Sequence, residues 1–222
     1  VTQPWDAQTT SVAWFSEAMT DEELGQDVGD AGIGLGELRK LGSGINSGSG
    51  DGGGGAFFGV KTPAKSVVYV VDRSSSMNHL HASREMTRFQ RVKVELLHSI
   101  AAMKPQQFFF IIFFTDEAFP MPAQTLQPAR RDRQQYYLNW MARIRANGKT
   151  DPLESMRLAL RLKPDVIYFL TDGAFRYKTA QRLSELSQRR TVINTITFGD
   201  REAETLMKLI ADNNRGTYRF IP

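Results

Sequence analysis

The sequence contains no cysteine, and no apolar run approaches the roughly eighteen residues that a membrane-spanning helix needs. The lack of cysteine excludes disulfides, thiolate metal sites and cysteine nucleophiles. It leaves the cellular compartment open, because proteins on both sides of a membrane can lack this residue. With 222 residues, of which 41% are hydrophobic, the chain is long enough for one domain or for one domain and a tail.

Charged residues are unevenly distributed along the chain. Residues 1–59 carry nine acidic and two basic side chains, whereas residues 60–222 carry 15 acidic and 26 basic ones. A basic body permits binding to nucleic acid or to an anionic surface. The basic residues are spread over several expected helices, however, and this distribution favours a solvated helix surface.

Residues 1–55 are expected to form a disordered tail or linker. Residues 1–24 contain too few apolar side chains for an independent core, and residues 25–55 are rich in glycine and of low complexity. A phosphate-binding glycine loop would need a strand before it and a helix after it, whereas residues 56–60 look like a strand. We therefore place the domain boundary at Ala56, with a single domain over residues 56–222.

The chain begins at Val1 rather than at methionine, which is compatible with a signal peptide or anchor upstream. The compartment is unknown from the sequence. A domain held in the cell envelope by an upstream anchor, on an acidic and glycine-rich tether, is the hypothesis that this arrangement suggests.

Short apolar runs alternate with segments of helical periodicity after residue 56. Such runs are typical of parallel strands that are buried on both faces. Strands are expected at residues 67–71, 108–114, 165–170, 191–198 and 217–221, and helices at 84–103, 132–144, 152–161, 179–189 and 202–213. Residues 118–126 contain two prolines and fit an edge strand or a loop. The alternation predicts a three-layer α/β/α Rossmann-like sandwich with a mostly parallel central sheet.

Small oxygen-bearing side chains follow the expected strand ends. Asp72 ends the first apolar run, and Ser74 and Ser76 follow it at alternate positions; Thr150 precedes a helix, and Asp172 follows the strand at 165–170. Open α/β sheets place their ligands at the carboxyl ends of their strands. Hard divalent cations such as Mg²⁺ prefer oxygen ligands, so the pattern predicts a cation site at this edge.

At these positions the sequence resembles a von Willebrand factor A (VWA) domain. The metal-ion-dependent adhesion site (MIDAS) of that family consists of an Asp-x-Ser-x-Ser motif, a threonine after a glycine-containing turn, and an aspartate in a Thr-Asp-Gly-like strand end. All five of these positions match in this chain: Asp72, Ser74, Ser76, Thr150 and Asp172.

The resemblance covers the order of elements from Val67 to Ile221. Phrases such as Phe57-Phe58-Gly59 and Lys163-Pro164-Asp165-Val166-Ile167 are similar to bacterial VWA proteins, particularly those of planctomycete type. One departure is Ser75, where many relatives have glycine. Ser75 lies between ligand positions and removes no oxygen, so the departure concerns only the local geometry of the loop.

The resemblance implies metal-dependent protein binding, in adhesion or as a scaffold, rather than catalysis. In this family the two serines and the threonine contact the cation directly, while the carboxylates act mostly through waters. Neutral hydroxyl ligands leave much of the positive charge of the cation unquenched, and an Asp or Glu of a protein partner supplies a further oxygen. The resemblance implies Mg²⁺ first, with Mn²⁺ or Ca²⁺ as alternatives, and it implies that Thr150 is the ligand that switches between direct and water-bridged binding.

Other polar residues near these strand ends have structural interpretations. Asp151 is expected to cap the following helix, and Asp116 is expected to be a solvated turn residue, with a supporting role beside the metal as the alternative. His79 and His81 are expected to be exposed, with a pH-sensitive contact as the alternative. Arg73 is expected to cover the sheet edge rather than to pair with an acid of a partner.

Two other classes of function have less support in the sequence. A metal-assisted hydrolase would use Asp72 or a serine as its nucleophile, but phosphatases with an aspartate nucleophile place a second aspartate where Ser74 stands, and no Gly-x-Ser-x-Gly motif is present. A module that binds nucleic acid has only the basic body in its favour.

For the metal-site interpretation, Asp72→Ala is expected to abolish metal binding with little effect on folding, because the site is expected at the sheet edge.

Overall fold

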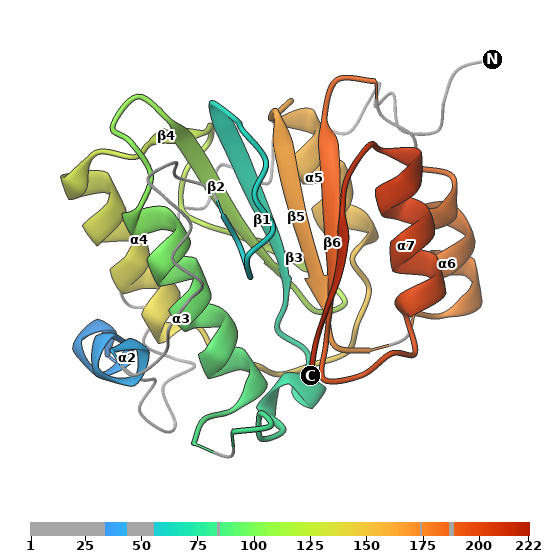
Figure 1. Ribbon diagram of the computed structural model, residues 1–222, viewed down its shortest axis with the longest axis horizontal. Coiled ribbons are helices and arrows are strands. Elements are labelled where there is room, and N and C mark those ends of the chain that lie inside the picture. The colour runs from blue at the N-terminus through green and yellow to red at the C-terminus, as the bar shows by residue number, and fades with distance from the viewer. Residues whose placement is uncertain (1–33, 44–55, 84, 174, 187–188) are drawn as a thin grey trace.

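The computed structural model describes residues 34–43, 56–83, 85–173, 175–186 and 189–222 (Figure 1). Its described part forms a seven-stranded sheet in the order β3-β2-β1-β5-β6-β7, with β4 also paired to β2. The strands β1, β2, β5, β6 and β7 run parallel, whereas β3 and β4 pair antiparallel to β2 at the edge. The strands are β1 (Ser66–Asp72), β2 (Phe108–Phe114), β3 (Ala118–Pro120), β4 (Gln127–Pro128), β5 (Val166–Thr171), β6 (Val192–Phe198) and β7 (Tyr218–Ile221).

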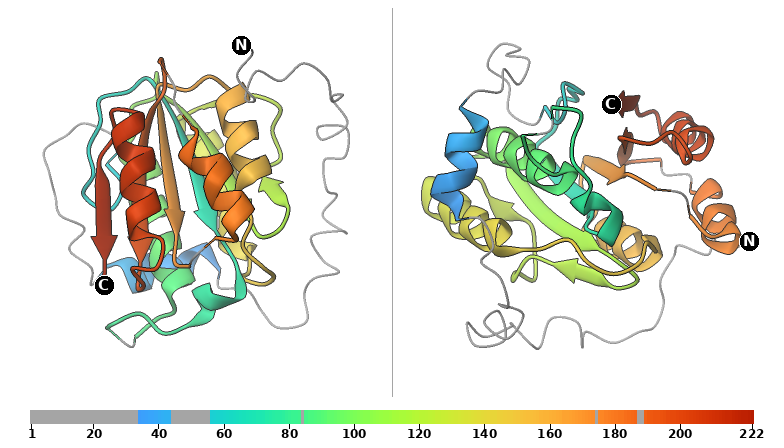
Figure 2. Two further views of the ribbon diagram at one scale, coloured as in Figure 1. Left: turned by 90° about the vertical axis from the view of Figure 1, so that its right-hand side faces the viewer. Right: turned by 90° about the horizontal axis from the view of Figure 1, so that it is seen from below.

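Helices cover both faces of the sheet and confirm the expected three-layer sandwich. The helices are α2 (Leu35–Gly42), α3 (Arg88–Ala101), α4 (Arg131–Arg143), α5 (Leu153–Arg161), α6 (Tyr177–Ser184) and α7 (Glu204–Asn213), with a short 3₁₀ helix, η2 (Ser75–Asn78). Helices α2, α3 and α4 pack together on one side; on the other, α5 packs against β1 and β2, α7 against β6 and β7, and α6 between them (Figures 1 and 2). No helix within the described ranges is both long and apolar enough to cross a bilayer.

The central strands are buried along almost their whole length, as their continuous apolar runs predict. Two tyrosines lie side by side in this core, with ring centroids of Tyr69 and Tyr168 5.8 Å apart. Their hydroxyls are satisfied, because Tyr69 shares a hydrogen bond of 2.7 Å with Ser99 and Tyr168 donates to the carbonyl of Val60 at 3.0 Å. Each tyrosine therefore adds apolar area without leaving a buried polar atom unpaired.

Helix α2 corrects the expectation that residues 25–55 form a flexible linker throughout. Its Leu35 and Leu38 are buried in the main core, and Leu41 packs against that core. Leucines at spacings of three make one apolar face of a helix. The many glycines around them made this helical pattern weak in the sequence. Residues 1–33 and 44–55 lie outside the described residues, and the boundary at Ala56 stays a prediction.

Residues 57–60 form a tight turn instead of the expected strand. Phe57 and Val60 exchange two backbone hydrogen bonds of 3.0 Å, with positive φ angles at Phe58 (47°) and Gly59 (73°) between them. Phe57 and Phe58 are nevertheless buried. The apolar segment therefore contributes to the core through a turn rather than through the expected strand.

Candidate metal site

The carboxyl ends of β1 and β5 lie next to each other at one edge of the sheet. Both strands are parallel, and Val71 is in register with Leu170. After β1 the chain crosses to α3 on one face, and after β5 it crosses to α6 on the other (Figure 1). This is the change of direction at which open α/β sheets form a crevice for ligands, and it brings Asp72 and Asp172 to one place.

Asp72 is fully buried at the end of β1. Its Oδ1 accepts a hydrogen bond of 2.7 Å from the backbone N–H of Ser74, and its Oδ2 accepts one of 2.6 Å from the hydroxyl of Thr171. Burial raises the pKa of Asp72 to about 6, although the hydrogen bonds from Ser74 and Thr171 oppose this shift. Asp72 therefore orients the serine loop and joins it to β5.

The two serines and Asp172 form a continuous chain of hydrogen bonds. The Oγ atoms of Ser74 and Ser76 lie 3.1 Å apart, and Ser76 donates to Oδ1 of Asp172 at 2.7 Å. Ser74 and Asp172 are buried, and Ser76 is half-buried. Four of the five predicted ligands are thus in one connected cluster.

Thr150 lies in a loop that is held against the same cluster by backbone contacts. The carbonyl of Gly148 accepts a hydrogen bond of 3.0 Å from Ser75, and the N–H of Asn147 donates to Arg73 at 2.7 Å. Gly148 has a φ of 81°, and a Cβ there would lie 3.1 Å from Thr115, so a glycine suits this turn. Thr150 is half-buried and follows Gly148 by two residues; none of the described hydrogen bonds joins its hydroxyl to the cluster, so its role as a ligand stays a prediction.

The cluster has the donor chemistry of a hard-cation site. It contains the carboxylates of Asp72 and Asp172 and the hydroxyl oxygens of the serines. Among the described residues, no group of three or more His, Cys, Asp or Glu side chains is arranged to hold a metal. Two oxygens on adjacent corners of an octahedron with metal–oxygen bonds of about 2.1 Å are separated by about 3 Å. The 3.1 Å between the Oγ atoms of Ser74 and Ser76 matches this separation, so the residues present fit Mg²⁺.

Two residues that contact the cluster were not singled out by sequence reasoning. Thr171 donates to Asp72, and Arg88 forms an ion pair of 2.9 Å with Oδ2 of Asp172. Thr171 could have been found from the sequence, because it is the first residue of the Thr-Asp-Gly motif that contains Asp172. Arg88 lies 84 residues from its partner in the chain, and no local pattern marks such a pair.

The other polar residues near the edge match their structural interpretations. Asp151 accepts a hydrogen bond of 3.1 Å from the backbone of Leu153 at the start of α5, which confirms its role as a cap. Arg73 donates to the carbonyl of Arg145 at 3.1 Å and lies 4.7 Å from the ring centre of Phe119, so it covers the edge. Asp116 and His79 are exposed.

His81 departs from the expectation of an exposed histidine. It is half-buried and its ring lies 5.4 Å from that of Phe198. Burial lowers the pKa of His81, with a further contribution from the positive charges of Arg91 and Arg88. It is therefore a packed side chain beside the site.

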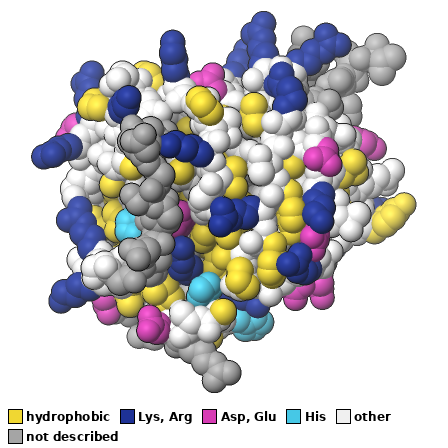
Figure 3. Space-filling view, viewed as in Figure 1, with side chains coloured by type: hydrophobic (Ala, Val, Ile, Leu, Met, Phe, Trp, Pro, Cys, Tyr) yellow, Lys and Arg dark blue, Asp and Glu magenta, His cyan; other side chains and the backbone are white. Residues whose placement is uncertain are grey.

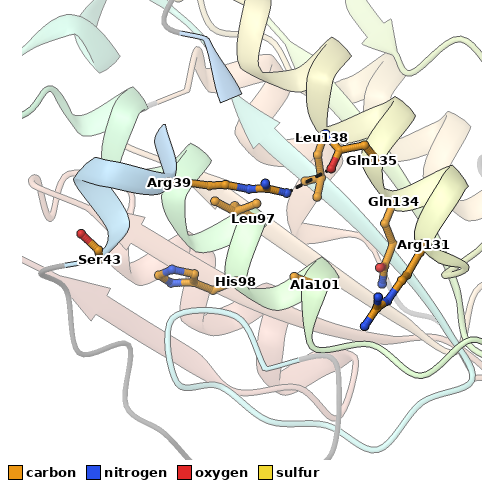
Figure 4. A pocket seen from close by; sticks show the side chains of 9 residues that line it. All are labelled: Arg39, Ser43, Leu97, His98, Ala101, Arg131, Gln134, Gln135 and Leu138. Atoms are coloured by element: carbon orange, nitrogen blue, oxygen red, sulfur yellow. Dashed lines mark hydrogen bonds between the residues drawn. The ribbon is translucent and has the colours of Figure 1, made fainter. Parts of the chain in front are cut away.

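Two cavities lie away from this cluster. One, of about 530 Å³, is bounded by α2, α3 and α4, where Arg39 reaches across to donate to Gln135 at 3.0 Å (Figure 4). The other, of about 660 Å³, lies at the opposite ends of the strands, beside Ser66 and Phe108. Neither cavity contains a predicted ligand, so neither belongs to the candidate metal site.

Several solved structures share the fold of this chain, and one of them is described as a von Willebrand factor type A protein. It is similar to a von Willebrand factor type A protein from Catenulispora acidiphila, with a TM-score of 0.59 and 20% identity over 73% of this chain and 40% of that one. It is also similar to proximal thread matrix protein 1 from the mussel byssus, with a TM-score of 0.53 and 19% identity over 70% of this chain and 41% of that one. A third similar structure is the PilB minor pilin from Streptococcus sanguinis, with a TM-score of 0.51 and 12% identity over 72% of this chain and 58% of that one.

These similarities define the fold of the chain as a VWA-like α/β fold. This chain spans less than two thirds of the length of each of these three proteins. No protein-family model matches the sequence, and no curated protein matches it.

Proposed function

We propose that this domain is a metal-dependent protein-binding module, whose divalent cation is held at the carboxyl edge of the sheet and completed by an Asp or Glu of a protein partner. VWA folds typically serve as adhesion or interaction modules and are generally not catalytic. The observation that carries the proposal is the pair of serine hydroxyls, 3.1 Å apart, held in place by two buried carboxylates. The proposed ligand set is that of the MIDAS resemblance, with Thr150 as the fifth residue.

Each residue has a defined task in this proposal. Ser74 and Ser76 present neutral hydroxyl oxygens, and Asp172 fixes the hydroxyl of Ser76. Asp72 fixes the backbone of Ser74 and so sets the direction of its side chain. Thr150 would supply a further hydroxyl from the loop that Gly148 joins to Ser75. A bound Mg²⁺ would act as a Lewis acid that is incompletely neutralised by hydroxyl ligands and therefore attracts the carboxylate of a partner.

The proposal is tested by calorimetric titration of the 222-residue protein with Mg²⁺ and with Mn²⁺. Wild type is compared with the double variant Ser74→Ala/Ser76→Ala, and with the control Ser43→Ala/Ser184→Ala, which removes one exposed and one half-buried hydroxyl, each bonded only to a carbonyl of its own helix. We expect binding by the wild type and by the control and none by the Ser74/Ser76 variant. Equal binding by all three proteins would refute the site.

A module for nucleic acid or anionic surfaces is the second candidate, supported by the basic body of residues 60–222. Lysines and arginines are scattered over the face in Figure 3 and do not gather in one patch. The two functions respond differently to conditions: binding to RNA or DNA weakens steeply as salt rises, whereas metal-dependent capture of a protein is lost on addition of a chelator. A metal-assisted hydrolase has less support, because none of the described hydrogen bonds joins a histidine to Asp72, Ser74 or Ser76.

A further inference from the structure

Arg88 is fixed at the start of α3, next to the candidate site. The preceding Thr87 caps this helix, because its hydroxyl accepts a hydrogen bond of 3.2 Å from Gln90 and the side chain of Gln90 accepts one of 2.8 Å from the N–H of Thr87. The N–H of Arg88 donates to the carbonyl of His79 at 2.9 Å, which joins the helix start to the loop after η2. The backbone thus sets the point from which the guanidinium extends.

The guanidinium of Arg88 forms an ion pair with one carboxylate oxygen of Asp172, which is a predicted metal ligand. Its Nη1 lies 2.9 Å from Oδ2 of Asp172, whose side chain is completely buried, while the side chain of Arg88 is 18% exposed. The other oxygen of Asp172 accepts the hydroxyl of Ser76. Both oxygens of this carboxylate are therefore engaged, one by a full positive charge.

The turn after β6 leaves space for this guanidinium. Gly199 has a φ of 72°, and a Cβ built there would lie 2.4 Å from both Cζ and Nε of Arg88. That separation is far below any van der Waals contact, so no larger residue is compatible with Arg88 in this position. Three elements surround the side chain of Arg88: the start of α3, the end of β5 and the turn after β6.

We propose, on the basis of the proposed function, that Arg88 sets the cation affinity of the site by neutralising Asp172. Two carboxylates and one guanidinium leave the cluster with a single net negative charge. The guanidinium also repels a dication held by Ser76 and Asp172, since the cluster is buried and charges interact strongly there. The free domain therefore holds its cation weakly, and the carboxylate of the partner is needed for tight binding.

The test compares Arg88→Gln with wild type by Mg²⁺ and Mn²⁺ calorimetry and by the Mg²⁺-dependent shift in melting temperature. We expect Arg88→Gln to bind Mg²⁺ at least about tenfold more tightly than wild type, because a neutral amide neither repels the dication nor neutralises Asp172. We expect its melting temperature to rise more on addition of Mg²⁺, since the stabilisation by a ligand increases with the logarithm of its affinity for the folded state.

Three further variants sharpen the test. Arg201→Gln is the matched control: Arg201 lies in the same turn after β6, but it pairs with Glu204 at 2.8 Å and is largely exposed, so its loss should leave the affinity unchanged. Arg88→Lys keeps the charge and should stay close to wild type. Arg88→Met is a second neutral variant for the case that glutamine disturbs folding.

An affinity of the neutral Arg88 variants equal to or below that of wild type would overturn the inference about Arg88 while leaving the proposed metal site intact. Absence of cation binding in wild type and in every variant would overturn the proposed function and this inference with it. Equal tightening in Arg201→Gln would show that net charge alone acts, which also overturns the specific role of Arg88.

Discussion

Asp72 joins two strand ends through its side chain, and this contact changes what its substitution is expected to do. The sequence suggested that Asp72→Ala would have little effect on folding, because the site was expected at the edge of the sheet rather than in the core. Asp72 is instead fully buried and accepts hydrogen bonds from the backbone of Ser74 and the hydroxyl of Thr171. The earlier reason is therefore wrong, although the expected loss of metal binding stays a prediction.

We predict that Asp72→Ala lowers the free energy of unfolding by about 2 kcal/mol in metal-free buffer, since two donors lose a buried acceptor. Urea denaturation at neutral pH measures this change. Asp116→Ala, which removes an exposed carboxylate near the same edge, is the control and should change stability by less than about 0.5 kcal/mol. Equal stability of Asp72→Ala and wild type would mean that the contacts of Asp72 contribute nothing to folding.

At the residue scale, the sequence predicted which side chains come together but not how they are held. The Asp-x-Ser-x-Ser phrase has its oxygens at alternate positions of one loop, and the parallel strands bring Asp172 to the same edge. The loop before Thr150 is joined to the serine loop through the carbonyl of Gly148. The position of the Arg88 guanidinium depends on the space beside Gly199. That space is a property of the folded chain and has no signature in the sequence.

Helices α3 and α4 enclose a lysine that has no acidic partner among its described contacts. Lys93 is buried, donates to the carbonyl of Ala142 at 2.8 Å and lies 4.9 Å from the ring centre of Phe89. Burial, with a smaller effect of Arg145, lowers the pKa of Lys93 to about 7. Because its pKa in the folded state is below that of the unfolded chain, the unfolded state binds more protons between about pH 7 and 10.5, and stability rises with pH in that range.

We predict that the free energy of unfolding of wild type increases by about 2 kcal/mol between pH 7 and 9 relative to that of Lys93→Met. Urea denaturation at pH 7, 8 and 9 gives this difference. Lys178→Met removes an exposed lysine and should follow the wild-type dependence. Parallel curves for wild type and Lys93→Met would show that Lys93 keeps an ordinary pKa in the fold.

At the scale of elements, the reliability of the sequence predictions followed the length and apolar character of each segment. The strands β1, β2 and β5 are long apolar runs and were located to within a residue or two. Helix α3 begins at Arg88 rather than at residue 84, because Thr87 with Gln90 forms the cap. Helix α2 was missed, since eight residues among many glycines carry a weak periodic signal.

At the scale of the whole molecule, the site follows from the order of the strands. Sheet order β3-β2-β1-β5-β6-β7 sends the connections after β1 and β5 to opposite faces. Open α/β sheets bind their ligands at such a change of direction, and the polar residues Asp72 and Asp172 lie at these two strand ends. Alternation of strands and helices was enough to predict this architecture, because parallel strands need crossover helices.

The charge of the whole molecule is a weaker guide to function. The basic side chains of residues 60–222 are dispersed over the surface visible in Figure 3, and dispersed charge gives steering rather than a specific site. The connected cluster from Asp72 to Asp172 is specific, because each atom has a defined partner. This contrast is the reason that we place the proposed function at the sheet edge.

The most direct test of that placement is a crystal structure of the protein with Mn²⁺, with anomalous diffraction measured to locate the cation. We predict one strong anomalous peak within about 2.3 Å of the Oγ atoms of both Ser74 and Ser76, and its loss in crystals of Ser74→Ala/Ser76→Ala. A fully occupied Mn²⁺ bound elsewhere, with none at the serine pair, would contradict the account.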